Sequence, residues 1–155
     1  MCLAEVNDVE FKVVLNLPRD AASVPLSRHV LDGSLQTLGV TDDTRTDIAL
    51  ALSEACANVI VHASSGEQYG VTASIRGGRC VIEVENSGTA PVSLPVPGGH
   101  APVSAEHGRG LTIMDAVVDN LRLTGNRQQG TTVHFEKALQ WIPGAAGEHL
   151  SRNDG

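Results

Sequence analysis

Aromatic side chains are nearly absent from this chain of 155 residues, since Phe, Trp and Tyr together make up 3% of it. Apolar residues of all kinds make up 41%, which is enough for one hydrophobic core in a single domain of this size. The core must therefore be built from aliphatic side chains, mainly Val, Leu, Ile and Ala.

Positive charge is also scarce. The sequence has 11 Lys and Arg against 18 Asp and Glu, which gives a formal net charge of −7. An acidic chain gains nothing from counterion release on nucleic acid, and anionic membrane surfaces repel it. We therefore expect neither nucleic acid nor a membrane among its direct partners.

Cysteine is sparse and scattered. Cys2, Cys56 and Cys80 form no CxxC pair, which argues against a disulfide framework and against a zinc knuckle. The sequence also lacks a run of about 18 apolar residues that could span a bilayer, and it lacks the pattern of a signal peptide. We expect a reduced, cytoplasmic domain.

The segments that are present mix strands and helices without strict alternation. A helix start is expected at Ser23-Val24-Pro25 and another at Thr41, where Thr41 acts as the N-cap. The expected strands are residues 9–17, 69–75, 79–84, 120–124 and 131–135, and the expected helices are residues 23–38, 41–63 and 108–119.

Neighbouring strands joined through glycines predict hairpins, and hairpins favour an antiparallel sheet. The predicted fold class is therefore α+β: a two-layer α/β sandwich with a mostly antiparallel sheet and helices on one face. We expect one domain over residues 1–140 and a mobile tail over residues 141–155.

Three polar residues follow one line along the otherwise apolar helix 48–63. Glu54, Asn58 and His62 are spaced at i, i+4 and i+8, so they form a stripe about 12 Å long. Such a stripe on a buried helix is costly unless each group has a partner, and a ligand-filled cleft would provide partners. An Asn oxygen suits Mg²⁺, and a carboxylate one turn away suits proton transfer. The alternative is a helix edge that meets solvent, with His62 as a packing or capping residue.

A glycine-rich loop precedes the helix that begins near residue 108. Gly108, Arg109, Gly110 and Leu111 match a loop that wraps an anion at a helix N-terminus, although a flexible hinge has the same composition. The Pro- and Gly-rich stretch at about 89–107 is expected to be a lid. Asn86-Ser87-Gly88 directly follows a strand, where it forms either part of a site or an ordinary turn.

Taken together, these segments resemble the Bergerat-fold (GHKL) ATPases, and most closely their stand-alone anti-sigma-factor and serine-protein-kinase branch. The resemblance rests on LALSEACANVIVHA (50–63), VIEVENSGTAP (81–91), HGRGLTIMDAVVDN (107–120) and GTTVHF (130–135), in that order along the chain. It implies the histidine-kinase-like ATPase fold with ATP and Mg²⁺ as cofactors.

The resemblance also implies a role for each matching residue. Asn58 would bind Mg²⁺, and Glu54 would activate the attacking hydroxyl. The cofactor-binding positions would be His62, Asn86, Gly88, Gly108, Arg109, Gly110, Leu111 and Thr131 or Thr132, with the lid at about 89–107. The implied partners are a sigma factor and an anti-anti-sigma (STAS-type) protein whose serine accepts the γ-phosphate, and a homodimer is usual in this branch.

One departure from the family pattern concerns the strand end. The family has D-x-G-x-G there, whereas this chain has Asn86 and Ala90 at the Asp and second Gly positions. A neutral acceptor binds the adenine amino group more weakly, and a flipped amide could equally serve guanine. The alternative function is therefore a non-catalytic anti-sigma-like binding module with weakened or lost nucleotide binding. A sensor histidine kinase fragment is not expected, since only eight residues precede the first predicted strand.

Overall fold

The computed structural model describes residues 11–62, 68–86, 112–126 and 130–148. Its elements are β1 (Lys12–Pro18), α1 (Ser23–Leu38), α2 (Asp42–His62), β2 (Gln68–Arg76), β3 (Arg79–Asn86), β4 (Asn120–Asn126) and β5 (Gly130–Ala138). A short helical segment at residues 112–117 precedes β4.

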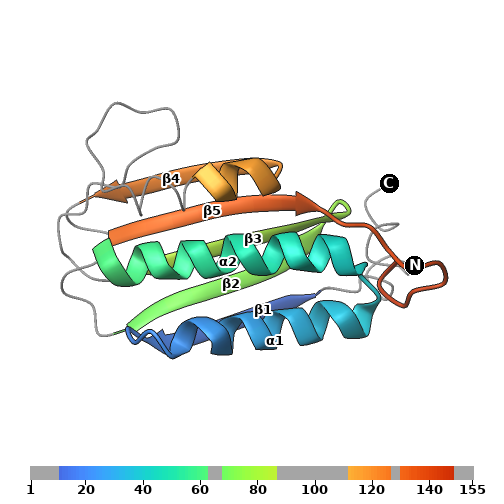
Figure 1. The fold of residues 1–155 in the computed structure, drawn as a ribbon, viewed down its shortest axis with the longest axis horizontal. Helices are drawn as coiled ribbons and strands as arrows, with labels where there is room; N and C mark the ends of the chain where they lie inside the picture. Colours follow the sequence, from blue (N-terminus) through green and yellow to red (C-terminus); the bar gives the residue numbers. More distant parts are fainter. Residues whose placement is uncertain (1–10, 63–67, 87–111, 127–129, 149–155) are drawn as a thin grey trace, which may run out of the picture.

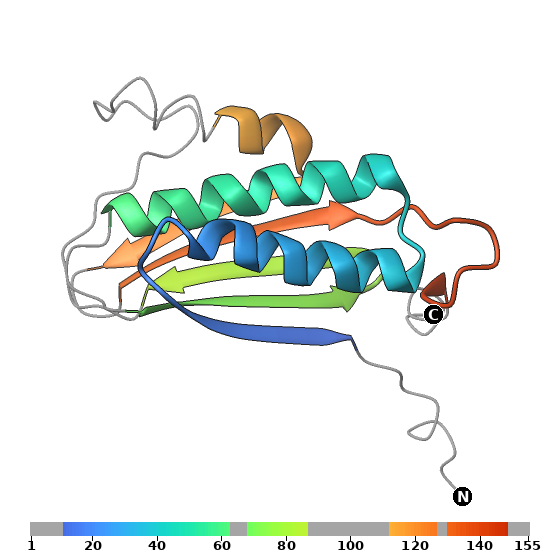
Figure 2. The same ribbon diagram turned by 60° about the horizontal axis from the view of Figure 1, so that its bottom comes forward.

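The strands form one antiparallel sheet in the order β1-β2-β3-β5-β4. Both long helices and the short helical segment lie on one face of this sheet, with α2 between α1 and the short segment (Figures 1 and 2). The predicted fold class, a two-layer α+β sandwich with helices on one face, is confirmed.

Helix α1 begins at Ser23, as the Ser-Val-Pro start predicts, and ends at Gly39. Gly39 has φ +95°, and its N–H donates to the carbonyls of Leu35 and Gln36. This left-handed cap suits glycine, since it has no Cβ to clash. The buried side chains of α1 recur every four residues and form one stripe toward the core, namely Ser23, Ser27, Leu31 and Leu35.

Helix α2 follows after a short link. The Thr41 carbonyl accepts the first helical hydrogen bond from the Arg45 N–H at 3.0 Å, and the Thr41 hydroxyl bonds to the Thr44 hydroxyl at 3.0 Å. Thr41 therefore occupies the predicted N-cap position. The buried residues of α2 include Ile48, Leu52 and Val59, whereas Leu50 keeps 38% of its surface exposed.

The core is aliphatic, as the composition predicts. It fills the space between the helices and the inward-facing residues of β2, β3 and β5, with Phe135 and Tyr69 as its largest side chains. On β2 and β3 buried residues alternate with half-buried or exposed ones. Alternation of this kind is expected for a sheet that is covered by helices on one face only.

The described part of the segment after β5 contacts the link between α1 and α2. Trp141 forms a β-bridge with Val40, and the N–H groups of Ile142 and Gly147 donate to Gly39 and Leu38 carbonyls, each at 2.8 Å. Residues 141–148 are thus docked on the α1–α2 link. The rest of the predicted tail, residues 149–155, lies outside the described residues.

Candidate nucleotide site

One end of the sandwich brings together the segments that the sequence marks as functional. The last turn of α2, the end of β3 and the start of β5 all lie at this end (Figure 1). The sheet register places Tyr69 of β2 opposite Asn86 of β3, and Asn86 opposite Thr131 of β5. Asn86 therefore sits in the middle of a row of three residues across the sheet.

Asn86 is buried in this row with both polar atoms of its side chain unpaired among the described residues. It is 1% exposed, and among the described residues neither its amide oxygen nor its amide nitrogen has a hydrogen-bond partner. A buried, unpaired polar group costs about 1–3 kcal/mol. Native proteins keep few such groups, and each needs a specific reason. The two unpaired atoms make Asn86 a candidate ligand-binding residue.

Helix α2 presents a second buried amide. Asn58 is 4% exposed, and its Nδ2 has no partner among the described residues. Because a half-turn about χ2 exchanges the two amide atoms, the same unpaired position can also present an oxygen. Glu54 lies one turn earlier on α2 and is half-buried. The carboxylate and the amide of the predicted stripe thus share a helix face near the end of the sandwich.

Arg19 contacts the helix turn beside Asn58, which the sequence did not predict. Its Nη2 donates to the carbonyl of Ile60 at 2.7 Å, in the last turn of α2, two residues beyond Asn58. A cation is favourable at a helix C-terminus. Arg19 ties the turn that carries Asn58 to the β1–α1 connection. An arginine directly after a strand-ending proline gives no sequence signal for this contact.

A buried polar network supports the Tyr69 end of the row. The Tyr69 hydroxyl bonds to Ser23 Oγ at 2.5 Å, and Ser27 Oγ lies 3.6 Å from Cys56 Sγ. Burial raises the pKa of Tyr69 to about 12, and burial also raises the pKa of Cys56. Tyr69 and Cys56 are therefore neutral structural groups at physiological pH. They join α1, α2 and β2 beside Asn86.

The two threonines of β5 lie opposite different residues of β3. Thr132 is half-buried and pairs with the exposed Glu85 on β3, whereas Thr131 pairs with Asn86. The register thus favours Thr131 over Thr132 as the neighbour of the site. The side chain of His62 lies outside the described residues, as do the lid at about 89–107 and the glycine-loop positions Gly88, Gly108, Arg109, Gly110 and Leu111.

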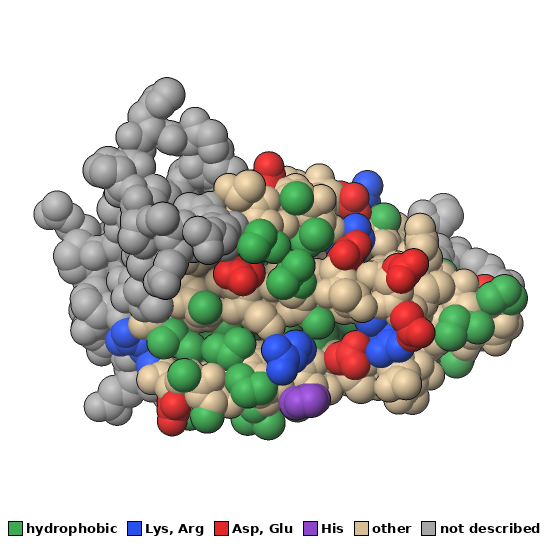
Figure 3. Space-filling view, viewed as in Figure 1, with side chains coloured by type: hydrophobic (Ala, Val, Ile, Leu, Met, Phe, Trp, Pro, Cys, Tyr) green, Lys and Arg blue, Asp and Glu red, His purple; other side chains and the backbone are tan. Residues whose placement is uncertain are grey.

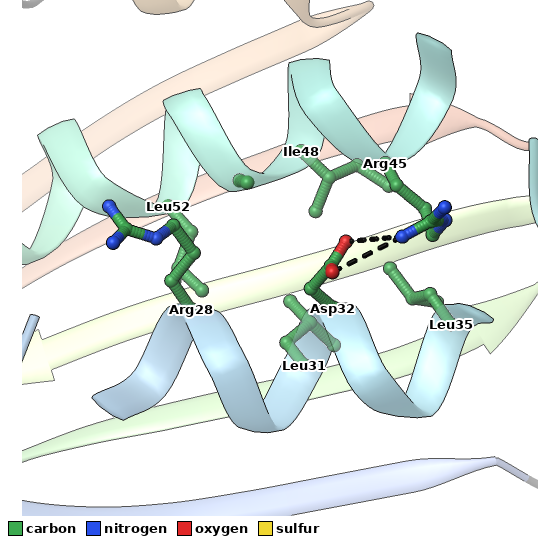
Figure 4. Close-up of a pocket in the computed structure, with 8 residues that line it drawn as sticks. Arg28, Leu31, Asp32, Leu35, Arg45, Ile48 and Leu52 are labelled. Carbon is green, nitrogen blue, oxygen red and sulfur yellow. Dashed lines mark hydrogen bonds and ion pairs between the residues drawn. The ribbon is translucent and has the colours of Figure 1, made fainter. Parts of the chain in front are cut away.

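Two hollows that the described residues form lie elsewhere, between α1 and α2. Figure 4 shows Arg45 of α2 paired with Asp32 of α1, with N–O distances of 3.0 and 3.2 Å, in a hollow that Leu31, Leu35 and Ile48 also line. Acidic and basic side chains intermingle on the helix face of the molecule (Figure 3). We interpret the Arg45–Asp32 pair as a salt bridge that holds α1 and α2 together.

Within the described residues there is no group of three or more His, Cys, Asp or Glu side chains arranged to hold a metal ion. No helix in the described part of the chain is long and apolar enough to cross a membrane.

The described residues form a two-layer α+β domain with two buried amides at one end, Asn58 and Asn86, which have amide atoms without a hydrogen-bond partner among those residues. The sequence profile described as the histidine kinase-like ATPase domain matches residues 17–137. The chain belongs to this family, which implies the use of ATP. The resemblance drawn from the sequence motifs is confirmed.

The chain is also similar to curated proteins with one name. It is 27% identical over 143 residues to proteins named serine-protein kinase RsbW from Bacillus thuringiensis (strain Al Hakam), Bacillus cereus (strain AH820) and Bacillus anthracis. Each match covers 83% of this chain and 86% of the relative.

Among solved structures, the fold is similar to that of the RsbU and RsbW domains of Rv1364c from Mycobacterium tuberculosis, with a TM-score of 0.65 and 20% identity. The match covers 83% of this chain but 32% of that longer chain. At this identity the likeness supports the fold alone.

Proposed function

We propose that this protein is an anti-sigma regulatory factor that acts in the cytoplasm as an ATP- and Mg²⁺-dependent serine kinase. Its substrate is an anti-anti-sigma protein of the STAS type, and it works by partner switching between that protein and a sigma factor. The names of its relatives support this assignment. The observation that carries it is the pair of buried amides at one end of the sandwich: among the described residues Asn86 has no partner for either amide atom, and Asn58 has none for its Nδ2.

Each of these residues has a proposed task. Asn86, in the sheet, binds the base of the nucleotide. The amide oxygen of Asn58 is a suitable Mg²⁺ ligand, since Mg²⁺ prefers oxygen donors and keeps several of its other positions for water and phosphate. When bound, Mg²⁺ neutralises negative charge on the phosphates.

Glu54 is the proposed general base. It lies one turn from Asn58, which is about 6 Å along the helix axis. There its carboxylate can accept the proton from a serine hydroxyl as that oxygen attacks the γ-phosphate. Gly108 and Gly110 are the proposed phosphate-loop residues.

The test combines nucleotide binding with phosphate transfer. ATP should bind more tightly with Mg²⁺ than without it in calorimetric titration. Labelled γ-phosphate should pass to a STAS-type protein of the same organism. Glu54→Gln should keep ATP binding and lose transfer. Asp43→Asn is the matched control, because Asp43 is exposed in the first turn of the same helix, about 16 Å from Glu54.

The alternative is a binding module that holds its partner without phosphorylating it. It is favoured by Asn86, which is neutral where the resembling ATPases carry a carboxylate. No nucleotide binding at millimolar concentration, together with retained binding of a sigma factor or a STAS-type protein, would establish the alternative. Equal transfer by wild type and Glu54→Gln would remove Glu54 from its proposed role.

A further inference from the structure

We propose that Asn86 reads the base of the nucleotide and that its amide makes the site accept 6-oxopurine as well as 6-aminopurine nucleotides. This inference rests on the proposed nucleotide-binding function and concerns its substrate class. Its basis is the side chain itself, which is 1% exposed and has no partner for either amide atom among the described residues.

The amide differs from a carboxylate in the groups that it offers. It presents an acceptor oxygen and a donor NH₂ side by side, whereas an ionised carboxylate only accepts. The edge of adenine has an amino donor beside a ring-nitrogen acceptor. The edge of hypoxanthine or guanine has a carbonyl acceptor beside a ring N–H donor. An amide in one orientation matches the first pattern, and after a half-turn it matches the second.

The surroundings of Asn86 leave both orientations open. A buried amide is normally fixed by the partners of its oxygen and nitrogen, but the described residues provide neither. Tyr69, its neighbour in the sheet row, already shares its hydroxyl with Ser23 at 2.5 Å. Since nothing among the described residues selects one orientation, the bound base selects it.

The experiment compares ATP with inosine triphosphate (ITP), which replaces the 6-amino group by a 6-oxo group and places a proton on the ring nitrogen beside it. Both are titrated into the full chain with Mg²⁺. We expect dissociation constants within about threefold of each other for the wild type. In Asn86→Asp, ATP binding should be kept or tightened while ITP binding weakens at least tenfold, because a carboxylate repels the 6-oxo group.

Asn120→Asp is the matched control. Asn120 is exposed at the start of β4 and pairs with Glu136, five residues along β5 from the partner of Asn86, or about 17 Å. It adds the same charge away from the site, so it should leave the ATP-to-ITP ratio unchanged.

The outcomes separate this inference from the proposed function. Wild-type protein that binds ATP at least tenfold more tightly than ITP overturns the inference and leaves the function intact. Binding of neither nucleotide overturns both. An unchanged ratio in folded Asn86→Asp removes Asn86 as the base-reading residue. If that variant does not fold, the wild-type ratio still decides whether the site accepts both bases.

Discussion

Replacing Asn86 by leucine should stabilise the nucleotide-free protein while abolishing nucleotide binding. Leucine keeps the branching at Cγ but has no polar atoms. The wild-type amide is 1% exposed and lacks partners for both polar atoms among the described residues, so its removal relieves the cost of a buried unpaired group, about 1–3 kcal/mol. We expect the free energy of unfolding to rise by about that amount. The midpoint of thermal unfolding should rise by about 2–4 °C for each kcal/mol.

The assay is urea unfolding without nucleotide, followed by titration with ATP. Asn120→Leu is the control, since a substitution at an exposed position usually changes the free energy of unfolding by less than about 0.5 kcal/mol. Leucine is larger than asparagine, so Asn86→Val is made in parallel to separate overpacking from loss of the amide. If both variants lower the free energy of unfolding by more than about 1 kcal/mol, the amide has a structural partner. Our reasoning about a ligand would then be refuted.

Four further predictions concern the scaffold. Gly33→Ala should stabilise the protein by about 0.5–1 kcal/mol, because Gly33 is in the interior of α1 and an added Cβ meets no atom within 4 Å. Gly147→Ala should destabilise the protein by about 1–3 kcal/mol in the same unfolding assay, because its Cβ would collide with the Trp141 ring and lie 2.9 Å from the Leu38 carbonyl oxygen. A urea midpoint that is higher for Gly147→Ala than for Gly33→Ala would contradict both predictions. The pKa of Glu136 is lowered from 4.5, mainly by the hydrogen bond from His134. Glu136→Gln should therefore have a lower free energy of unfolding than wild type above pH 4.5, and this difference should vanish as the pH falls through the lowered pKa. A difference that stays constant down to pH 2 would exclude this. Burial raises the pKa of Cys80 to about 12, so peptide mapping should find Cys80 unalkylated at pH 8 until the protein is unfolded, and fast alkylation of folded protein would contradict the core position.

Local signals were sufficient for most of the fold. The end of α1 was predictable because only glycine readily adopts the φ of +95° at Gly39. The β2–β3 hairpin was predictable because Gly77 and Gly78 have φ of +58° and +73°, the conformation that a two-residue turn requires. Each of these signals acts within a few residues, so the sequence alone displays it.

The features that the sequence did not reveal depend on contacts between distant segments. Trp141 and Gly147 are held by backbone groups of residues 38–40, and backbone hydrogen bonds leave no pattern in side-chain composition. The hydrogen bond from Arg19 to the Ile60 carbonyl spans 41 residues, and it too leaves no pattern in the sequence. The candidate site was predictable only in part. Its residue types were recognisable, but only burial distinguishes Asn86 from an ordinary turn asparagine.

The unpaired amides lie beside contacts that hold their elements in place. Tyr69 is fixed to Ser23 next to Asn86, and Arg19 binds the α2 turn that follows Asn58. An amide on a loosely held element would shift until it found a partner or water, because an unpaired buried group is costly. Among the described residues both amide atoms of Asn86 and the Nδ2 of Asn58 have no partner, and we propose that a ligand binds there. Preorganisation lowers the cost of ordering a site on binding, and we propose it as the reason why two buried amides lie at one end of an otherwise aliphatic core.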